Sequence, residues 1–151
     1  MPGDDPPRVV LDSNVFVSGT ILPRGASTEI LQSWRHGAFT LVTSLAQVTE
    51  IIEVLERPKF ARRYGVRVTE IAALIRRIEA TAITLDILDP PVMKLRDPDD
   101  EVILATAMTG NARFLVTGDY DLLSVDADPR LRSLRVLRPA EFLARLSSEM
   151  P

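Results

Sequence analysis

The sequence predicts one α/β domain of three layers, α/β/α, in which helices cover both faces of a central parallel sheet. Short runs of apolar and β-branched residues alternate along the chain with longer segments of helical periodicity. Such alternation is typical of parallel sheets, because each helix returns the chain to the same end of the sheet. Two runs, RVVLD at 8–12 and ARFLVTGD at 112–119, are mostly apolar up to a final aspartate, as expected for strands buried on both faces.

The length of 151 residues fits one domain of ordinary size, large enough to bury a core without disulfides. No repeat or low-complexity tract divides the chain. We expect the domain to cover residues 8–146, between a flexible N-terminal tail at 1–7 and a C-terminal tail at 147–151.

The elements expected in chain order follow from apolar pattern and local end signals. A Ser-x-x-Gln capping box at Ser44 and Gln47 opens one helix, which stops at Pro58, and Gly37 closes the helix before it. The expected strands are 8–12, 39–44, 82–88, 112–119 and 134–139. The expected helices are 27–37, 44–58, 68–80, 98–112 and 139–146. The apolar stripe of the helix at 44–58 comprises Leu45, Val48, Ile51, Ile52 and Leu55.

Composition restricts the kinds of site that the chain can form. There is no cysteine and only one histidine, His36, so thiolate sites and multi-histidine clusters are excluded and any metal must be held by oxygen. The net charge of −3 argues against nucleic-acid binding through overall charge, whereas ERPKFARRYGVR at 56–67 is a local basic zone. The apolar runs are too short to span a membrane and the opening does not resemble a signal peptide, so we expect a soluble cytoplasmic protein.

Two aspartates follow strands that should be neighbours in the sheet. Asp12 closes the first strand and Asp119 closes the fourth, so both should project from the carboxyl edge, where ligands of parallel sheets bind. Taken singly, Asp12 could cap the next segment and Asp119 could form a turn with Gly118. Their shared position favours a joint role.

The acids of RDPDDE at 96–101 have two different explanations. In a helix that begins near Pro98, Asp97 is the N-cap, and acids in the first turn interact favourably with the helix dipole. Capping does not explain Asp100, which shares a face with Ile103 and Leu104 and should therefore pack on the sheet. Since the amino end of such a helix abuts the carboxyl edge of the sheet, Asp100 should meet the two strand-end aspartates.

Three carboxylates in contact repel each other unless a cation holds them ionised. All-oxygen, acid-rich ligation in an open pocket suits Mg²⁺ or Mn²⁺. Such ions support phosphodiester hydrolysis without a side-chain nucleophile. A further ligand could come from the helix at 44–58, but Glu50, Glu53 and Glu56 all lie off its apolar stripe, and spacing does not choose among them.

Four segments together resemble the PIN-domain family, and more narrowly the single-domain VapC-like ribonucleases that are toxins of type II toxin–antitoxin systems. The segments are VVLDSNVFVSG, TEIIEVLERPKF, RDPDDEVILATA and FLVTGDYDLL, in the order and spacing of the family. The resemblance assigns the catalytic and metal-binding acids to Asp12, Glu50, Asp100 and Asp119. It adds Asp121 as a further metal ligand and makes Ser13, Asn14 and Thr117 supporting residues.

The resemblance implies a Rossmann-like fold and an Mg²⁺- or Mn²⁺-dependent endoribonuclease. It also implies a homodimer, and a small antitoxin protein whose segment occupies the active-site groove. Because a net acidic protein needs local cations to hold RNA, the candidates for backbone contact are Arg57, Lys59, Arg62 and Arg63.

Three alternative functions compete with this hypothesis. A response-regulator receiver fits poorly, because the first strand ends in LDSN without an acid pair and the last strand lacks a following lysine. A PIN domain that binds without cutting and an RNA-processing nuclease without an antitoxin stay open on the sequence alone.

Overall fold

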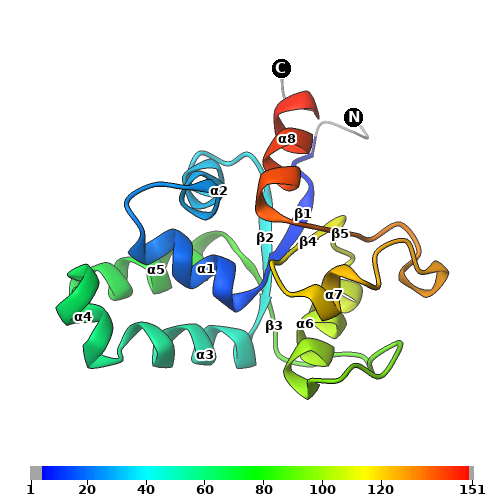
Figure 1. Ribbon diagram of the computed structural model, residues 1–151, viewed down its shortest axis with the longest axis horizontal. Coiled ribbons are helices and arrows are strands. Elements are labelled where there is room, and N and C mark those ends of the chain that lie inside the picture. The colour runs from blue at the N-terminus through cyan, green and yellow to red at the C-terminus, as the bar shows by residue number, and fades with distance from the viewer. Residues whose placement is uncertain (1–4, 150–151) are drawn as a thin grey trace.

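The structure is a computed structural model that describes residues 5–149. Its centre is a five-stranded sheet in which all strand pairs are parallel, in the order β3-β2-β1-β4-β5. Helices lie on both sides of this sheet (Figure 1), which confirms the predicted three-layer α/β/α fold. The strands are β1 (Arg8–Leu11), β2 (Thr40–Ser44), β3 (Ile83–Leu85), β4 (Phe114–Val116) and β5 (Arg135–Leu137).

The helices divide into a large group on one face and a small group on the other. Apolar side chains of α1, α2, α3, α5 and α8 share one core cluster, whereas those of α6 and α7 belong to a second. The helices are α1 (Ser13–Ile21), α2 (Ala26–Arg35), α3 (Leu45–Leu55), α4 (Pro58–Tyr64), α5 (Val68–Thr81), α6 (Pro98–Thr109), α7 (Tyr120–Leu123) and α8 (Pro139–Glu149). The described chain also has a short 3₁₀ turn at Pro129–Leu131, and none of its helices is long and apolar enough to cross a membrane.

Strand β1 shows how the sheet separates the two cores. Val9 and Leu11 point to the larger cluster, and Val10 points to the smaller one. All three side chains are fully buried. This alternation explains why the strand is apolar at consecutive positions, since both of its faces are covered.

The sequence predictions omit three helices that the structure contains. In α1 the consecutive residues Val15, Phe16 and Val17 are all buried, so the segment has no amphipathic stripe. Helix α4 has the opposite property, since none of its residues is buried, and α7 is a single turn. None of the three therefore has the periodicity on which helix prediction relies.

Two details at element ends differ from expectation. Leu45 is 55% exposed rather than part of the buried stripe, because it is the first residue of α3, directly after the N-cap Ser44. Helix α8 continues to Glu149, past the predicted domain end at 146, so the expected C-terminal tail begins inside a helix. Residues 1–4 of the expected N-terminal tail and 150–151 lie outside the described residues.

The strand order places a topological switch point between β1 and β4. From β1 the chain moves outward to β2 and β3, and then crosses through α6 to β4 and β5 on the other side. In register, Leu11 pairs with Val116, so Asp12 and Thr117 leave the sheet side by side. The carboxyl edge at a switch point is where open α/β sheets bind ligands.

Candidate metal centre

Asp12 lies at the switch point, where β1 leads into α1. Its backbone N–H donates to the carbonyl of Val116 at 2.9 Å, which fixes it at the end of the sheet. Although Asp12 is the N-cap residue of α1, its side chain makes no capping hydrogen bond. Instead, Oδ2 accepts a hydrogen bond from the hydroxyl of Thr117 at 2.7 Å. The carboxylate is therefore available to the edge of the sheet, and the capping alternative does not account for it.

Burial of Asp12, which is only 8% exposed, raises the pKa of its carboxyl. The hydrogen bond from Thr117 acts against this rise, as do the backbone amides of Ser13 and Asn14, while the charge of Asp119 adds to it. The side chain of Asn14 itself is exposed. The net effect is a pKa of the Asp12 carboxyl above its ordinary value.

Thr117 connects two of the predicted acids through one hydroxyl group. The side chain is fully buried, and its Oγ1 donates to Asp12 and accepts the backbone N–H of Asp119 at 2.9 Å. Asp119 in turn accepts the backbone N–H of Asp121 at 2.8 Å and caps α7. Thr117 therefore fixes the relative positions of Asp12 and the loop that carries Asp119.

Asp100 is buried at the start of α6, as its position on the apolar face predicts. Asp97 caps the helix by accepting the N–H of Asp99 at 2.9 Å, and Pro98 is the first helical residue. Asp100 is 7% exposed and shares the packed face with Ile103. Its Oδ2 is buried without a hydrogen-bond partner in the described part of the chain. A buried acceptor of this kind is costly unless something outside the chain satisfies it.

Burial and the charges of nearby acids together raise the pKa of Asp100 to about 7. Burial has the largest effect, followed by the charges of Asp119, Asp97 and Asp12 in that order. Carboxylate oxygens of Asp100, Asp119 and Asp121 lie within 4.8 Å of one another. Three acids at this separation, one of them with an unpartnered buried oxygen, fit a divalent cation with oxygen ligands.

Arg96 brings a positive charge close to this group. Its Nε lies 3.9 Å from Oδ2 of Asp121, with the arginine side chain 86% exposed. The contact involves Asp121 and does not involve the buried, unpartnered oxygen of Asp100. No sequence signal singled out Arg96, because its position depends on the course of the loop before α6.

Glu50 lies on α3 and contacts Ser13, the residue that follows Asp12. The side chain is exposed, and Oε2 accepts a hydrogen bond from the hydroxyl of buried Ser13 at 3.1 Å. Ser13 is therefore connected to Glu50, whereas Thr117 is connected to Asp12. A cleft of about 240 Å³ between α3 and α6 is lined by Ala46, Gln47, Glu50, Asp99, Val102 and Ile103.

Gln47 positions α3 in a way that the sequence did not indicate. Ser44 accepts the backbone N–H of Gln47 at 3.2 Å, as a capping box requires. The amide of Gln47 does not return to Ser44, however. It is 3% exposed, donates to the carbonyl of Leu11 and accepts from the hydroxyl of Thr43 at 2.8 Å. This buried amide ties α3 to β1 and β2, and hence holds Glu50 near Ser13.

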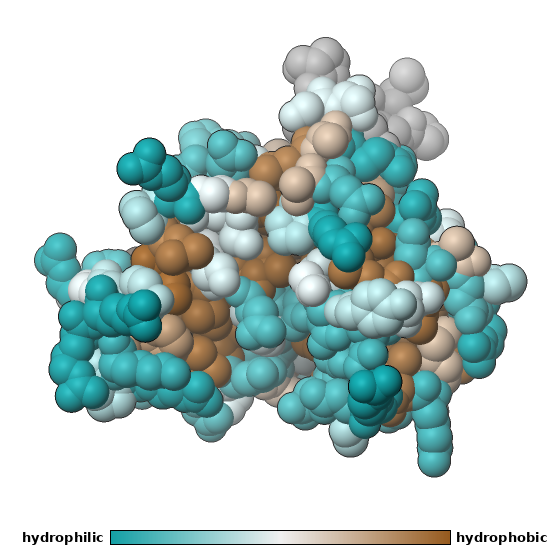
Figure 2. All heavy atoms as spheres, viewed as in Figure 1, coloured by the Kyte–Doolittle hydropathy of each residue, from teal (hydrophilic) through white to brown (hydrophobic). Residues whose placement is uncertain are grey.

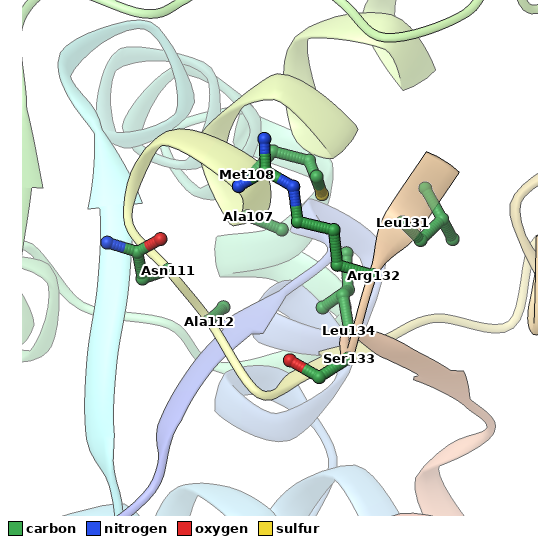
Figure 3. A pocket seen from close by; sticks show the side chains of 8 residues that line it. All are labelled: Ala107, Met108, Asn111, Ala112, Leu131, Arg132, Ser133 and Leu134. Atoms are coloured by element: carbon green, nitrogen blue, oxygen red, sulfur yellow. The ribbon is translucent and has the colours of Figure 1, made fainter. Parts of the chain in front are cut away.

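The predicted RNA-contacting residues are not part of this acidic group. Arg57 precedes α4, and the other three lie on it; all four are exposed. A separate small pocket of about 70 Å³ lies near the amino ends of β4 and β5 (Figure 3). Its lining residues, which include Met108, Asn111 and Arg132, contain no carboxylate, so it is not a candidate metal site.

Comparison with known proteins gives one family and several relatives. Residues 8–121 match the family model of the PIN domain. The chain is 29% identical over 143 residues to the uncharacterized protein MJ1680 of Methanocaldococcus jannaschii, which covers 90% of this chain and 89% of that protein. It is also similar to a chain in the crystal structure of VapBC2 from Rickettsia felis bound to a DNA fragment from their promoter. That match has a TM-score of 0.55, an identity of 15%, and coverage of 87% of this chain and 98% of the other.

A chain in the crystal structure of FitAcB from Neisseria gonorrhoeae matches with a TM-score of 0.49, an identity of 18% and the same coverage of both chains. This score is too low to support an argument. At its identity, the VapBC2 match bears on the fold alone.

Proposed function

The chain belongs to the PIN-domain family, and we propose that it is a metal-dependent endoribonuclease that hydrolyses RNA phosphodiester bonds as the toxin of a toxin–antitoxin pair. The observation that carries the proposal is the acidic group at the carboxyl edge of the sheet. There a buried oxygen of Asp100 lacks a partner among the described residues, next to Asp119 and Asp121. An arrangement that is unfavourable for the chain alone becomes favourable once a cation binds.

In this proposal Asp100, Asp119 and Asp121 hold Mg²⁺ or Mn²⁺, with Asp12 on the β1 side and Glu50 on α3. A divalent cation at this position would supply the acidity that activates water and the positive charge that stabilises the leaving oxygen. Thr117 holds Asp12 and the Asp119 loop in place through its buried hydroxyl. Ser13 orients Glu50, whose exposed carboxylate is accessible to substrate and water.

The substrate polyanion must approach a protein with a net charge of −3. Local cations therefore have to hold the RNA backbone near the acids. The residues proposed for this role are Arg57, Lys59, Arg62 and Arg63.

The toxin hypothesis further proposes a small antitoxin protein as partner, a homodimer as the active assembly and the cytoplasm as the location. The fold shared with a chain of the VapBC2 structure supports this hypothesis. A nuclease that processes RNA without an antitoxin would have the same acids. Toxicity of induced expression, relieved by a small protein encoded next to the gene, distinguishes the two.

The test is cleavage of a mixed RNA panel by the purified chain with Mn²⁺ or Mg²⁺, compared with chelator and with Asp100→Asn. Asp128→Asn is a matched control, because Asp128 pairs with Arg130 at 2.8 Å outside the acidic group. We expect cleavage that requires the metal, is lost in Asp100→Asn and is retained in Asp128→Asn. Cleavage that survives in Asp100→Asn would contradict the proposal. Metal binding without any cleavage would favour a PIN domain that only binds.

A further inference from the structure

Helix α4 differs from every other long helix of the described chain in that none of its residues is buried. It contains no acidic residue and carries Lys59, Arg62 and Arg63, with Arg57 directly before it. None of these four cations forms an ion pair within residues 5–149. In Figure 2 hydrophilic side chains gather at the left end of the molecule, where Figure 1 places α4. The helix is thus an exposed surface whose positive charge is not used by the fold.

Two aromatic rings lie among these cations. Phe60 and Tyr64 are four residues apart and so fall on the same side of the helix, with ring centroids 5.9 Å apart and planes inclined by 29°. The ammonium of Lys59 lies 5.3 Å from the Phe60 ring, and the guanidinium of Arg63 lies 5.5 Å from the Tyr64 ring. Phe60 also packs against the larger core cluster, which anchors the pair. The rings and cations form one preordered group.

This group borders a groove of about 450 Å³, lined by Lys59, Phe60, Arg62, Arg63 and Tyr64. Its size lies within the range of about 300–1,000 Å³ that is typical of sites for small organic groups. The lining offers two kinds of contact only: flat apolar ring faces and positive charge. Both kinds are needed by a ligand that combines a planar aromatic group with an anion.

We propose that the groove on α4, lined by the five residues above, binds unpaired nucleotides of single-stranded RNA, with bases stacked on Phe60 and Tyr64 and phosphates held by the neighbouring cations. Aromatic rings inside a basic groove are the usual means of binding single strands without regard to sequence. A duplex hides the faces of its bases, so it can use the cations but not the rings. The inference rests on the proposed function and deepens it, because it adds a binding site for unpaired bases on α4, apart from the acidic group.

An acidic peptide is the other occupant that the charge would admit. Its carboxylates would satisfy the cations but would leave the stacked rings without a planar partner. The single-strand proposal accounts for both features of the groove. It also fits the chain connectivity, since α3 carries Glu50 and leads directly through Arg57 to α4. One strand of about 4–16 nucleotides, the usual span of single-strand sites, can then contact both regions.

The experiment measures binding in the Asp100→Asn background, so that affinity is read without cleavage. A labelled RNA of roughly 12 nucleotides is used as a single strand and again annealed to its complement. We expect Tyr64→Leu and Phe60→Leu to weaken single-strand binding about tenfold or more and to leave duplex binding unchanged. Tyr64→Phe, which keeps the ring, should retain affinity. Circular dichroism and thermal unfolding confirm that each variant is folded.

Salt dependence separates the rings from the charges. Arg63→Gln should lower the slope of log affinity against log salt by about one, because one phosphate contact is lost. Tyr64→Leu should lower affinity and leave this slope unchanged. Arg67→Gln, which removes an exposed cation that is paired with Glu70 at 3.5 Å, is the control for lost charge and should change the slope less.

Equal loss of single-strand and duplex binding in Tyr64→Leu would overturn the inference, as would no loss at all. Displacement of the RNA by an acidic peptide, with affinity for that peptide dependent on the rings, would instead identify a protein partner and would also overturn it. The binding ratio does not depend on catalysis. A wild-type chain that cuts no RNA would therefore defeat the proposed function while the ratio still decides this inference.

Discussion

Asp100 and Asp126 are two carboxylates held by the fold in opposite electrostatic environments. Both oxygens of Asp126 accept hydrogen bonds from Arg135 at 3.0 Å, and Oδ1 also accepts the N–H of Val136 at 2.9 Å. The Arg135 hydrogen bonds lower the pKa of Asp126. Asp100 has a buried oxygen without a partner in residues 5–149, and burial first, then nearby acids, raise its pKa to about 7.

The difference shows what each acid contributes. Asp126 is satisfied within the chain and stabilises the loop before β5. The buried oxygen of Asp100 has no hydrogen-bond partner among the described residues. An apolar residue at this position would avoid the cost of burying that oxygen. The nearby cation of Arg96 reaches Asp121 and remains largely exposed. The negative charge of Asp100 and its neighbouring acids is thus not balanced by Arg96. A divalent cation bound from solution would balance it.

The largest expected effect is on activity. Loss of a residue that only positions a metal ligand lowers activity by about 10–100-fold. Asp100→Asn removes a proposed ligand itself, so we expect it to lower metal-dependent RNA cleavage by more than this. Asp126→Asn should leave activity per folded molecule within a few-fold of wild type. Initial rates at saturating Mn²⁺ test the contrast. Similar losses in the two variants would remove the distinction between the sites.

The next effect concerns Thr117, which acts through Asp12 and Asp119. Thr117→Val keeps the shape of the side chain and removes the hydroxyl, so Asp12 loses a buried donor. We expect about 10–100-fold weaker Mn²⁺ binding or activity with the fold retained. Calorimetric titration of Mn²⁺ measures the binding, and Thr117→Ser should recover most of it. Wild-type affinity in the valine variant would show that the hydroxyl does not position the acids.

Stability should change in opposite directions at the two sites in metal-free protein. Asp100→Asn should stabilise the fold by about 1–3 kcal/mol near pH 8, since each pKa unit is worth about 1.4 kcal/mol and the amide still lacks a full set of partners. Asp126→Asn should destabilise it by about 1–2 kcal/mol, because charged hydrogen bonds are lost at a partly exposed site. Urea unfolding measures both free energies.

The pH dependence follows from the direction of each pKa shift. The raised pKa of Asp100 means that its favourable contribution is complete below the ordinary value of 3.8 and is lost as pH rises toward 7. The gain in Asp100→Asn should therefore grow across this window. The lowered pKa of Asp126 gives stability that is present above 3.8 and lost as pH falls below it. A gain at position 100 that is constant with pH would contradict the assignment.

The smallest expected effect is at Arg96. Removing a cation near the acids should tighten Mn²⁺ binding by about two- to fivefold in Arg96→Ala, because two charges about 4 Å apart in water interact by about 1 kcal/mol. Arg67→Ala is the matched control, since Arg67 is similarly exposed and pairs with Glu70. Weaker Mn²⁺ binding in Arg96→Ala alone would assign Arg96 to the organisation of the site.

The sequence predicts an element correctly where its apolar pattern follows directly from which of its faces are buried. Both faces of β1 are covered, so its apolar run indicates a parallel strand, and the stripe that includes Ile51 and Leu55 predicts α3. In α1 the pattern fails because the consecutive residues Val15, Phe16 and Val17 are all buried in the larger core cluster. That burial depends on the tertiary structure and leaves no periodicity to detect.

The residues of the candidate site also differ in how far the sequence predicts their positions. Asp12, Asp119 and Asp100 could be placed together from strand ends and one helix face, and the structure brings them to one edge. Glu50 could not be placed at the site from periodicity, because it is exposed. Its position depends on Ser13 and on the buried amide of Gln47. Family resemblance, rather than periodicity, selected it among the glutamates of α3.

The measurement that tests the central claim most directly is the Mn²⁺ dependence of thermal unfolding at neutral pH for wild type, Asp100→Asn and Asp126→Asn. A ligand that binds only the folded state raises the unfolding temperature, and the rise grows with the logarithm of the ratio of ligand concentration to dissociation constant. We predict a rise with Mn²⁺ in wild type and in Asp126→Asn, and little or none in Asp100→Asn. Equal rises in all three proteins, or no rise in wild type, would contradict a cation site at the carboxyl edge of the sheet.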